Sequence, residues 1–217
     1  DDTAANLDLT DGSSVGSATG KVGDGANFVS ASSDVLSRAD HATLRPGPDL
    51  TIQAWAKFNS FVDFAGIVNK HTSGSNGFQI VTVNTNKIQF YVLDTGGGFK
   101  MAETAALSTG VWYHIIATYD SADKIARIYI NDGAAVVSDV LTNGIDVSGA
   151  ADFLVGSHQT GIFANAVIDQ VAFWQRVITS TERTRLYNSG NGCAYADLVA
   201  TDCVTGAPTV IRHRVIQ

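Results

Sequence analysis

The fold class is decided by the segment Trp112–Ile130, which reads WYHIIATYDSADKIARIYI. Two runs rich in β-branched and aromatic residues, Trp112–Tyr119 and Ile125–Ile130, flank the polar turn sequence Asp120–Asp123. Such residues favour strands, and a short polar interruption between two strands favours a hairpin. Asn131-Asp132-Gly133 then gives a second tight-turn signal before Ala134–Val140. The segment therefore predicts an antiparallel hairpin that continues into a third strand.

The same pattern recurs along most of the chain. Successive residues of Thr51–Phe58 are expected on opposite faces of a strand, with Ile52, Ala54, Ala56 and Phe58 on one face. Further strands are predicted at 78–83, 87–93, 153–156 and 167–174. Period-2 alternation that turn residues interrupt at short intervals is typical of an antiparallel sandwich or barrel. One short C-terminal helix is predicted after Thr179, which can form a capping box with Glu182, and Gly190 suits its end.

Composition excludes several classes of protein. The 217 residues carry a net charge of -7, and only 16% of them are charged. Binding to a nucleic-acid backbone needs clustered Lys and Arg, so no nucleic-acid partner is expected. No apolar run approaches the roughly 18 residues of a membrane span. The sequence favours one sandwich domain over residues 1–190, followed by an extended tail over 191–217.

Several strings run in the order found in a known family. The chain resembles the laminin G-like branch of the concanavalin A-like lectin/glucanase superfamily, in the form common in bacterial and phage surface proteins. The strings that carry the resemblance are Gly20–Gly23, Asp34–Ala39, Leu50–Trp55, Ile67–Lys70, Gly110–Ile115, Ala117–Asp120, Ile128–Gly133, Ile168–Val171, Trp174–Arg176 and Leu186–Asn188. The resemblance implies a jelly-roll sandwich of two curved antiparallel sheets.

Catalysis is not expected. Glycosidases that resemble this family use paired glutamates on one strand, because the chemistry needs a nucleophile and an acid close together. This chain has two glutamates, Glu103 and Glu182, which are 79 positions apart. The leading hypothesis is thus a non-catalytic extracellular binding or adhesion module, and a glycoside hydrolase is the weaker alternative.

Aromatic residues outside the family strings are the candidate ligand-binding residues. Sugar sites combine an aromatic platform with amides and carboxylates. Trp55, Trp112 and Trp174 match family positions that pack the sandwich. The candidates are therefore Phe61, Phe64, Phe99 and Phe163 in loops, with Tyr91 on a strand. Such a set fits a glycan partner or a protein surface.

The resemblance also implies a structural calcium ion. Relatives use the aspartate of the Ile-Asp-x-Val string, which is Asp169 here, and Asp24 is a second possible oxygen donor. Gln170 and Val29 stand where the family often has Glu and Asp, which weakens the expectation.

The tail carries the only two cysteines. Cys193 and Cys203 lie ten positions apart, so a disulfide would close a short loop. A disulfide predicts an oxidising location, namely extracellular, on a cell surface or on a virion surface. Thr209–Gln217 alternates between apolar and polar residues, which is typical of a strand. Such a strand either folds back on its own sandwich or adds to the sheet of a neighbouring copy. Self-assembly through residues 207–217 would make the protein a structural surface component, which is the alternative function.

Overall fold

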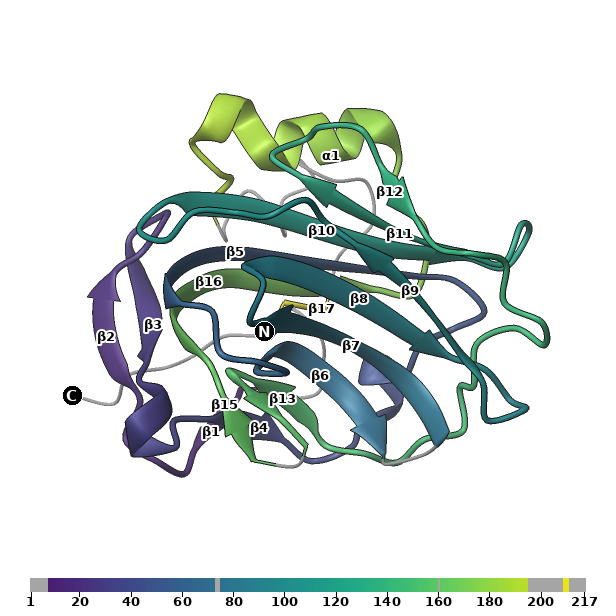
Figure 1. The fold of residues 1–217 in the computed structure, drawn as a ribbon, viewed down its shortest axis with the longest axis horizontal. Helices are drawn as coiled ribbons and strands as arrows, with labels where there is room; N and C mark the ends of the chain where they lie inside the picture. The colour runs from purple at the N-terminus through teal and green to yellow at the C-terminus, as the bar shows by residue number, and fades with distance from the viewer. Residues whose placement is uncertain (1–7, 73–74, 160, 195–208, 211–217) are drawn as a thin grey trace.

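The computed structural model describes residues 8–72, 75–159, 161–194 and 209–210 (Figure 1). Its strands form two large antiparallel sheets. Sheet A has the order β1 (Thr10–Asp11), β4 (Leu36–Arg38), β13 (Phe153–Val155), β6 (Gly66–Thr72), β7 (Ser75–Val83), β8 (Lys87–Leu93) and β9 (Phe99–Glu103). Sheet B has the order β12 (Val136–Val137), β11 (Ile125–Ile130), β10 (Trp112–Asp120), β5 (Leu50–Ser60), β16 (Asn165–Trp174), β3 (Asp24–Phe28) and β2 (Gly16–Thr19), with β17 (Thr209–Val210) beside β16.

The remaining elements are short. They are the strands β14 (Ser157–His158) and β15 (Ile162–Phe163), the helix α1 (Ser180–Tyr187), and the 3-10 turns η1 (Ser30–Ser32), η2 (Ala42–Leu44) and η3 (Asn188–Gly190). The predicted two-sheet jelly-roll sandwich is confirmed. Within the described part of the chain, no helix is long and apolar enough to cross a membrane.

The predicted hairpin forms β10 and β11, the second and third strands from one edge of sheet B. Asp120 pairs with Ile125, and Lys124 closes the turn with a left-handed backbone. Asn131 and Asp132 both have positive φ, and the Gly133 N–H donates to the Ile130 carbonyl, as in a type I′ turn. The third strand is shorter than predicted, since only Val136–Val137 pairs in β12. β12 lies at the edge of sheet B, and edge strands are commonly short.

The core lies between the two sheets. The predicted inward face of β5 is confirmed, because Ile52, Ala54, Ala56 and Phe58 are all buried in the main hydrophobic cluster. A second, smaller cluster lies on the opposite side of sheet B, under α1. It consists of Ile116, Ala172, Trp174, Ile178, Leu186 and Cys193. α1 therefore covers the side of sheet B that faces away from sheet A (Figure 1).

The helix begins as predicted and ends earlier. The Thr179 hydroxyl accepts from the Glu182 N–H, and the Glu182 carboxylate accepts from the Thr179 N–H, which completes the capping box. The predicted end at Gly190 is wrong, because Asn188 already adopts the left-handed conformation that ends the helix. Asn tolerates that conformation better than most residues.

The described part of the tail contacts its own sandwich. Thr209 and Val210 pair with Phe173 and Ala172 of β16. This pairing is the fold-back arrangement of the two that the alternating tail sequence allowed. Cys193 is buried against the small cluster under α1. Cys203 lies outside the described residues, so the disulfide stays a prediction.

Candidate functional site

The candidate site is the side of sheet A that faces away from sheet B, which we call the outer face. Successive side chains of a strand point to opposite sides of a sheet. Phe78, Ile80, Phe90 and Val92 belong to the main core. Their neighbours on β7 and β8 therefore occupy the outer face, and they are Gln79, Val81, Gln89 and Tyr91.

Strand register brings five outer-face residues into one line across the sheet. Leu154 pairs with Asn69, Asn69 with Gln79, Gln79 with Tyr91, and Tyr91 with Met101. We call these five residues the central rung. Neighbouring strands lie about 4.8 Å apart, so the rung is about 19 Å long. It crosses β13, β6, β7, β8 and β9.

Three aromatic side chains gather at the β8–β9 end of the rung. The ring centroid of Tyr91 lies 5.5 Å from that of Phe99 and 6.3 Å from that of Phe64. We call Phe64, Tyr91 and Phe99 the aromatic cluster. Phe99 is 59% exposed, Phe64 39% and the adjacent Met101 37%, whereas Tyr91 is buried at their base. Exposed aromatic groups over a fixed tyrosine offer an apolar platform to a ligand.

The backbone holds Phe64 in an unfavourable conformation. Its φ is +56°, which is rare for a bulky residue. The turn is closed by the Ala65 N–H, which donates to the Val62 carbonyl at 3.3 Å. Thr82 fixes this turn to β7, because its hydroxyl donates to the Val62 carbonyl at 2.6 Å and its N–H donates to the Ala65 carbonyl at 2.9 Å. Strain of this kind is found where a side chain has to be presented for binding.

A polar chain runs beside the aromatic cluster. The Tyr91 hydroxyl donates to Gln89 Oε1 at 2.6 Å, and Gln89 Nε2 donates to Glu103 Oε2 at 2.6 Å. Lys87 Nζ donates to the other Glu103 oxygen at 2.5 Å. The Lys87 and Gln89 hydrogen bonds lower the pKa of Glu103. Glu103 is therefore an ionised carboxylate whose charge is already matched by Lys87.

A cleft of about 330 Å³ lies at the β6–β13 end of the rung. Its lining is half apolar and half polar, and consists of His71, Ala150, Ala151, Asp152, Leu154 and Gln159. Burial, and then the nearby His158, lower the pKa of His71 to about 4. Burial also lowers the pKa of His158. Both rings are thus neutral at neutral pH, and the buried His71 Nδ1 has no hydrogen-bond partner.

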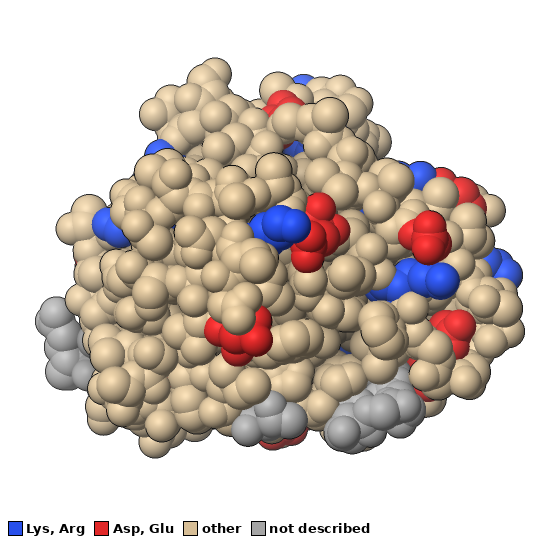
Figure 2. Space-filling model, viewed as in Figure 1, with Lys and Arg blue, Asp and Glu red and all other residues tan. Residues whose placement is uncertain are grey.

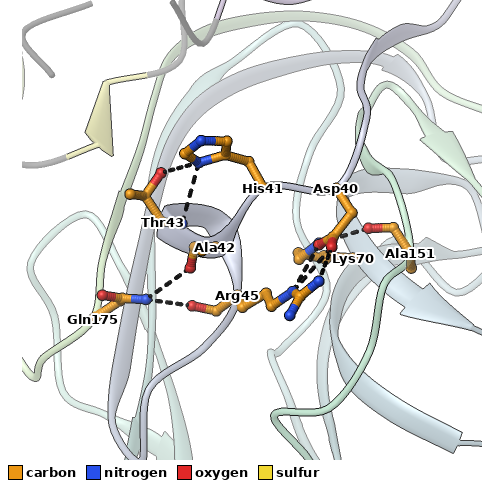
Figure 3. Close-up of polar contacts among 8 residues, drawn as sticks. All are labelled: Asp40, His41, Ala42, Thr43, Arg45, Lys70, Ala151 and Gln175. Atoms are coloured by element: carbon orange, nitrogen blue, oxygen red, sulfur yellow. Dashed lines mark hydrogen bonds and ion pairs between the residues drawn. The ribbon is translucent and has the colours of Figure 1, made fainter. Parts of the chain in front are cut away.

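A buried lysine fixes one wall of the cleft (Figure 3). Lys70 is 2% exposed, and its Nζ donates to Asp40 Oδ1 and to the Ala151 carbonyl, each at 2.6 Å. Asp40 also forms an ion pair with Arg45, and the Arg45 and Lys70 hydrogen bonds lower the pKa of Asp40 to about 2. Residues 150–152 are thereby tied to β6.

The structure brings three of the five aromatic candidates together. Phe64, Tyr91 and Phe99 form the cluster, whereas Phe61 packs on Phe58 at the edge of the core, 4.6 Å between centroids. Phe163 lies half-buried on β15. The sequence patterns did not indicate Met101, Gln79, Gln89 or the cleft residues. Alternation on β7 and β8 could have placed Gln79 and Gln89 with Tyr91, but the cleft depends on contacts between distant segments.

The tryptophans pack against other parts of the molecule and do not belong to this site. Trp55 is buried on the far side of sheet B, where it stacks on His114 at 4.8 Å and on Tyr187 at 6.0 Å. Trp174 is buried under α1. Lys57 Nζ lies over the Trp112 ring, 5.3 Å from the ring centroid.

The predicted calcium donors fit a metal ion poorly. The Asp169 carboxylate accepts backbone N–H groups from Lys21 at 2.8 Å, Val22 at 2.9 Å and Gln170 at 2.7 Å. These donors use about three of the four acceptor positions of a carboxylate. Asp24 is exposed in the neighbouring strand. Across the described ranges, no three His, Cys, Asp or Glu side chains are grouped to hold a metal ion.

The two glutamates lie on opposite sides of the sandwich. Glu103 is on the outer face of sheet A. Glu182 is in α1, beyond sheet B, where Arg176 pairs with it at 2.7 Å. These positions prevent them from acting as the nucleophile and acid of one glycosidase site.

The two antiparallel sheets and their order define a jelly-roll sandwich of the concanavalin A-like class. The family model described as the concanavalin A-like lectin/glucanases superfamily, of laminin G type, matches residues 29–182, and the chain belongs to this family. The resemblance predicted from the sequence strings is confirmed.

Three solved structures illustrate the similarity in fold. The binding domain of Paraclostridial Mosquitocidal Protein 1 matches 85% of this chain and 48% of its own, with a TM-score of 0.70 and 18% identity. Domain 4 of AbnA, an extracellular arabinanase from Geobacillus stearothermophilus in complex with arabinotriose, matches 84% and 82%, with a TM-score of 0.61 and 15% identity. The binding domain of botulinum neurotoxin DC in complex with SialylT matches 83% and 46%, with a TM-score of 0.66 and 12% identity. The chain thus spans about half the length of the two toxin domains.

Proposed function

We propose that this protein is a non-catalytic extracellular module that binds a glycan on the outer face of sheet A. The observation that carries the proposal is the aromatic cluster, in which exposed Phe64 and Phe99 flank Tyr91. Sugar rings have apolar faces edged with hydroxyls, so they suit aromatic groups placed beside polar ones. Gln89 and Glu103 supply such polar groups next to Tyr91.

Two similar folds support this proposal. The arabinanase domain was solved with arabinotriose, and the neurotoxin domain with SialylT. On the one face of the molecule that Figure 2 shows, charged side chains are few and scattered, which suits an uncharged partner better than a polyelectrolyte.

The test is a glycan array followed by calorimetric titration of the best glycan. We expect Phe99→Ala to weaken binding at least about tenfold, which corresponds to about 1.4 kcal/mol. The matched control is Val29→Ala, because Val29 is 38% exposed and follows β3 in the other sheet. If no glycan binds the wild-type protein, or if both variants bind alike, the proposal is wrong and a protein surface becomes the preferred partner.

Calcium, self-assembly through residues 207–217 and a virion location stay separate proposals. Calcium would raise the unfolding temperature relative to EDTA, and Asp169→Asn would remove the increase. Self-assembly would be lost, in size-exclusion chromatography, when residues 207–217 are deleted.

A further inference from the structure

A small hairpin lies on sheet A without being one of its strands. Within the described part of the chain, β14 and β15 pair only with each other, Ser157 with Phe163 and His158 with Ile162. An isolated two-stranded hairpin is marginally stable in water at best. β14 and β15 therefore depend on the surface against which they pack.

That surface is β6. Immediately before β14, the Gly156 N–H donates to the Ile67 carbonyl at 3.2 Å. A Cβ atom added at Gly66 would lie 2.2 Å from the Ser157 carbonyl oxygen, so the backbone of β14 runs directly against the backbone of β6. Such close contact between backbones needs glycine at position 66.

A pair of histidines joins β14 to β6. The ring centroids of His71 and His158 lie 6.1 Å apart, and each residue is 9% exposed. Burial lowers the pKa of both rings, and His158 lowers that of His71 further. Two imidazolium ions at this separation would repel each other and would both lack the water that normally solvates them. The closed arrangement therefore suits two neutral rings.

The charged groups beside the pair do not offset this repulsion. Asp152 lines the same cleft as His71. Lys70, the next residue on β6, bonds Asp40, which also pairs with Arg45. The two cations are thus balanced by the two carboxylates. Because burial and His158 still lower the pKa of His71, Asp152 does not hold a proton on this ring in the closed arrangement.

We propose that the His71–His158 pair is an acid-sensitive latch, which holds β14 and β15 on β6 while both rings are neutral and releases them when the rings are protonated. Release opens the cleft, because His71 lines it from β6 and Gln159 lines it directly after β14. Release also uncovers Ile162 of β15, which packs against the main core. The latch is independent of the proposed glycan binding.

The direction and size of the effect follow from proton linkage. A released His71 regains a pKa of about 6.5, against about 4 in the closed arrangement. The closed arrangement is fully favoured above pH 6.5 and loses this advantage as the pH falls toward 4. Between pH 8 and pH 5, His71 alone raises the ratio of released to closed molecules about 30-fold. Burial makes His158 act in the same direction.

The test is hydrogen exchange of the full chain, followed by mass spectrometry at pH 8 and pH 5 and corrected for the intrinsic exchange rates. The reporters are the Gly156 and Ala164 amides, which donate to the Ile67 and Gly156 carbonyls. Their protection should fall at least about 30-fold at pH 5 and stay below that of the β10 amides, which open only with the whole sandwich. In His71→Asn and in His158→Asn, the fall should be at least about tenfold smaller.

The matched control is His41→Asn. His41 is half-buried at the start of η2, where its ring accepts from the Thr43 N–H. Asparagine keeps such a cap and removes one titrating ring elsewhere in the molecule. The control should show the same fall in protection as the wild-type protein.

Two results would overturn the latch. One is an unchanged fall in protection in a folded His71→Asn or His158→Asn protein. The other is equal protection of the reporter and β10 amides at pH 5, because β14 and β15 would then open only when the whole domain unfolds. If one variant does not fold at pH 8, the other decides. Neither result bears on glycan binding through Phe99.

Discussion

Phe64 combines a strained backbone with a place in the proposed binding site. Its ring lies near Tyr91, and its backbone has a φ of +56°. Gly adopts this conformation freely, whereas Ala does not. We expect Phe64→Gly to be more stable than Phe64→Ala by about 1 kcal/mol, and both variants to bind glycan more weakly. Urea unfolding measures the stabilities. Equal stability of the two variants would show that position 64 is not strained.

His114 makes stability depend on pH. It is fully buried between strands, and both ring nitrogens lack hydrogen-bond partners. Burial lowers its pKa to about 3, against about 6.5 in an unfolded chain. As the pH falls below about 6.5, the unfolded chain therefore takes up the proton first. Stability that is complete above pH 6.5 is lost on the way down to about pH 3.

The measurement is the free energy of unfolding at pH 7 and pH 5. One proton over this window is worth about 2 kcal/mol, so the wild-type protein should lose at least that amount. His114→Phe should reduce this loss of unfolding free energy by about 2 kcal/mol, which is the contribution of one histidine. His71 contributes in the same direction, since its pKa is about 4. A loss that is identical in the variant would mean that His114 is not the group responsible.

At the scale of elements, α1 stabilises sheet B and is not part of the candidate site. Leu186 is fully buried in the small cluster with Ile116 and Trp174. Leu186→Ala should lower the free energy of unfolding by about 2–5 kcal/mol, because it leaves a cavity. Glycan affinity should stay unchanged, since both layers of the sandwich separate α1 from the outer face of sheet A. Calorimetric titration of folded protein checks this, and a parallel loss of affinity would place the site near α1 instead.

At the scale of the whole molecule, the tail bears on where the protein works. Cys193 is buried next to α1. We predict a bond to Cys203 that closes an 11-residue loop and stabilises the tail attachment by about 2–3 kcal/mol. Intact mass after alkylation of the denatured protein, with and without reductant, decides it. Alkylation of both thiols without reductant would leave the extracellular location without this support.

The sequence by itself determined the faces of the strands and the main turns. Alternation is a local property, so Ile52, Ala54, Ala56 and Phe58 could be assigned to one buried face from β5 alone. The turn at Asn131-Asp132-Gly133 was equally readable, since its geometry depends on the turn residues themselves. The length of β12 could not be predicted from the sequence, because the pairing of an edge strand depends on its neighbouring strands.

The tertiary structure alone decided which residues meet on the candidate face. Leu154 lies beside Asn69 on the central rung although 85 positions separate them in the sequence, and Tyr91 joins this rung only through the register of β7 with β8. Ala151 in the cleft lining is tied to β6 by the hydrogen bond from Lys70 to its carbonyl, across 81 positions of sequence. Local patterns fix which side of a strand a residue occupies, but chain topology and strand register fix which residues become neighbours.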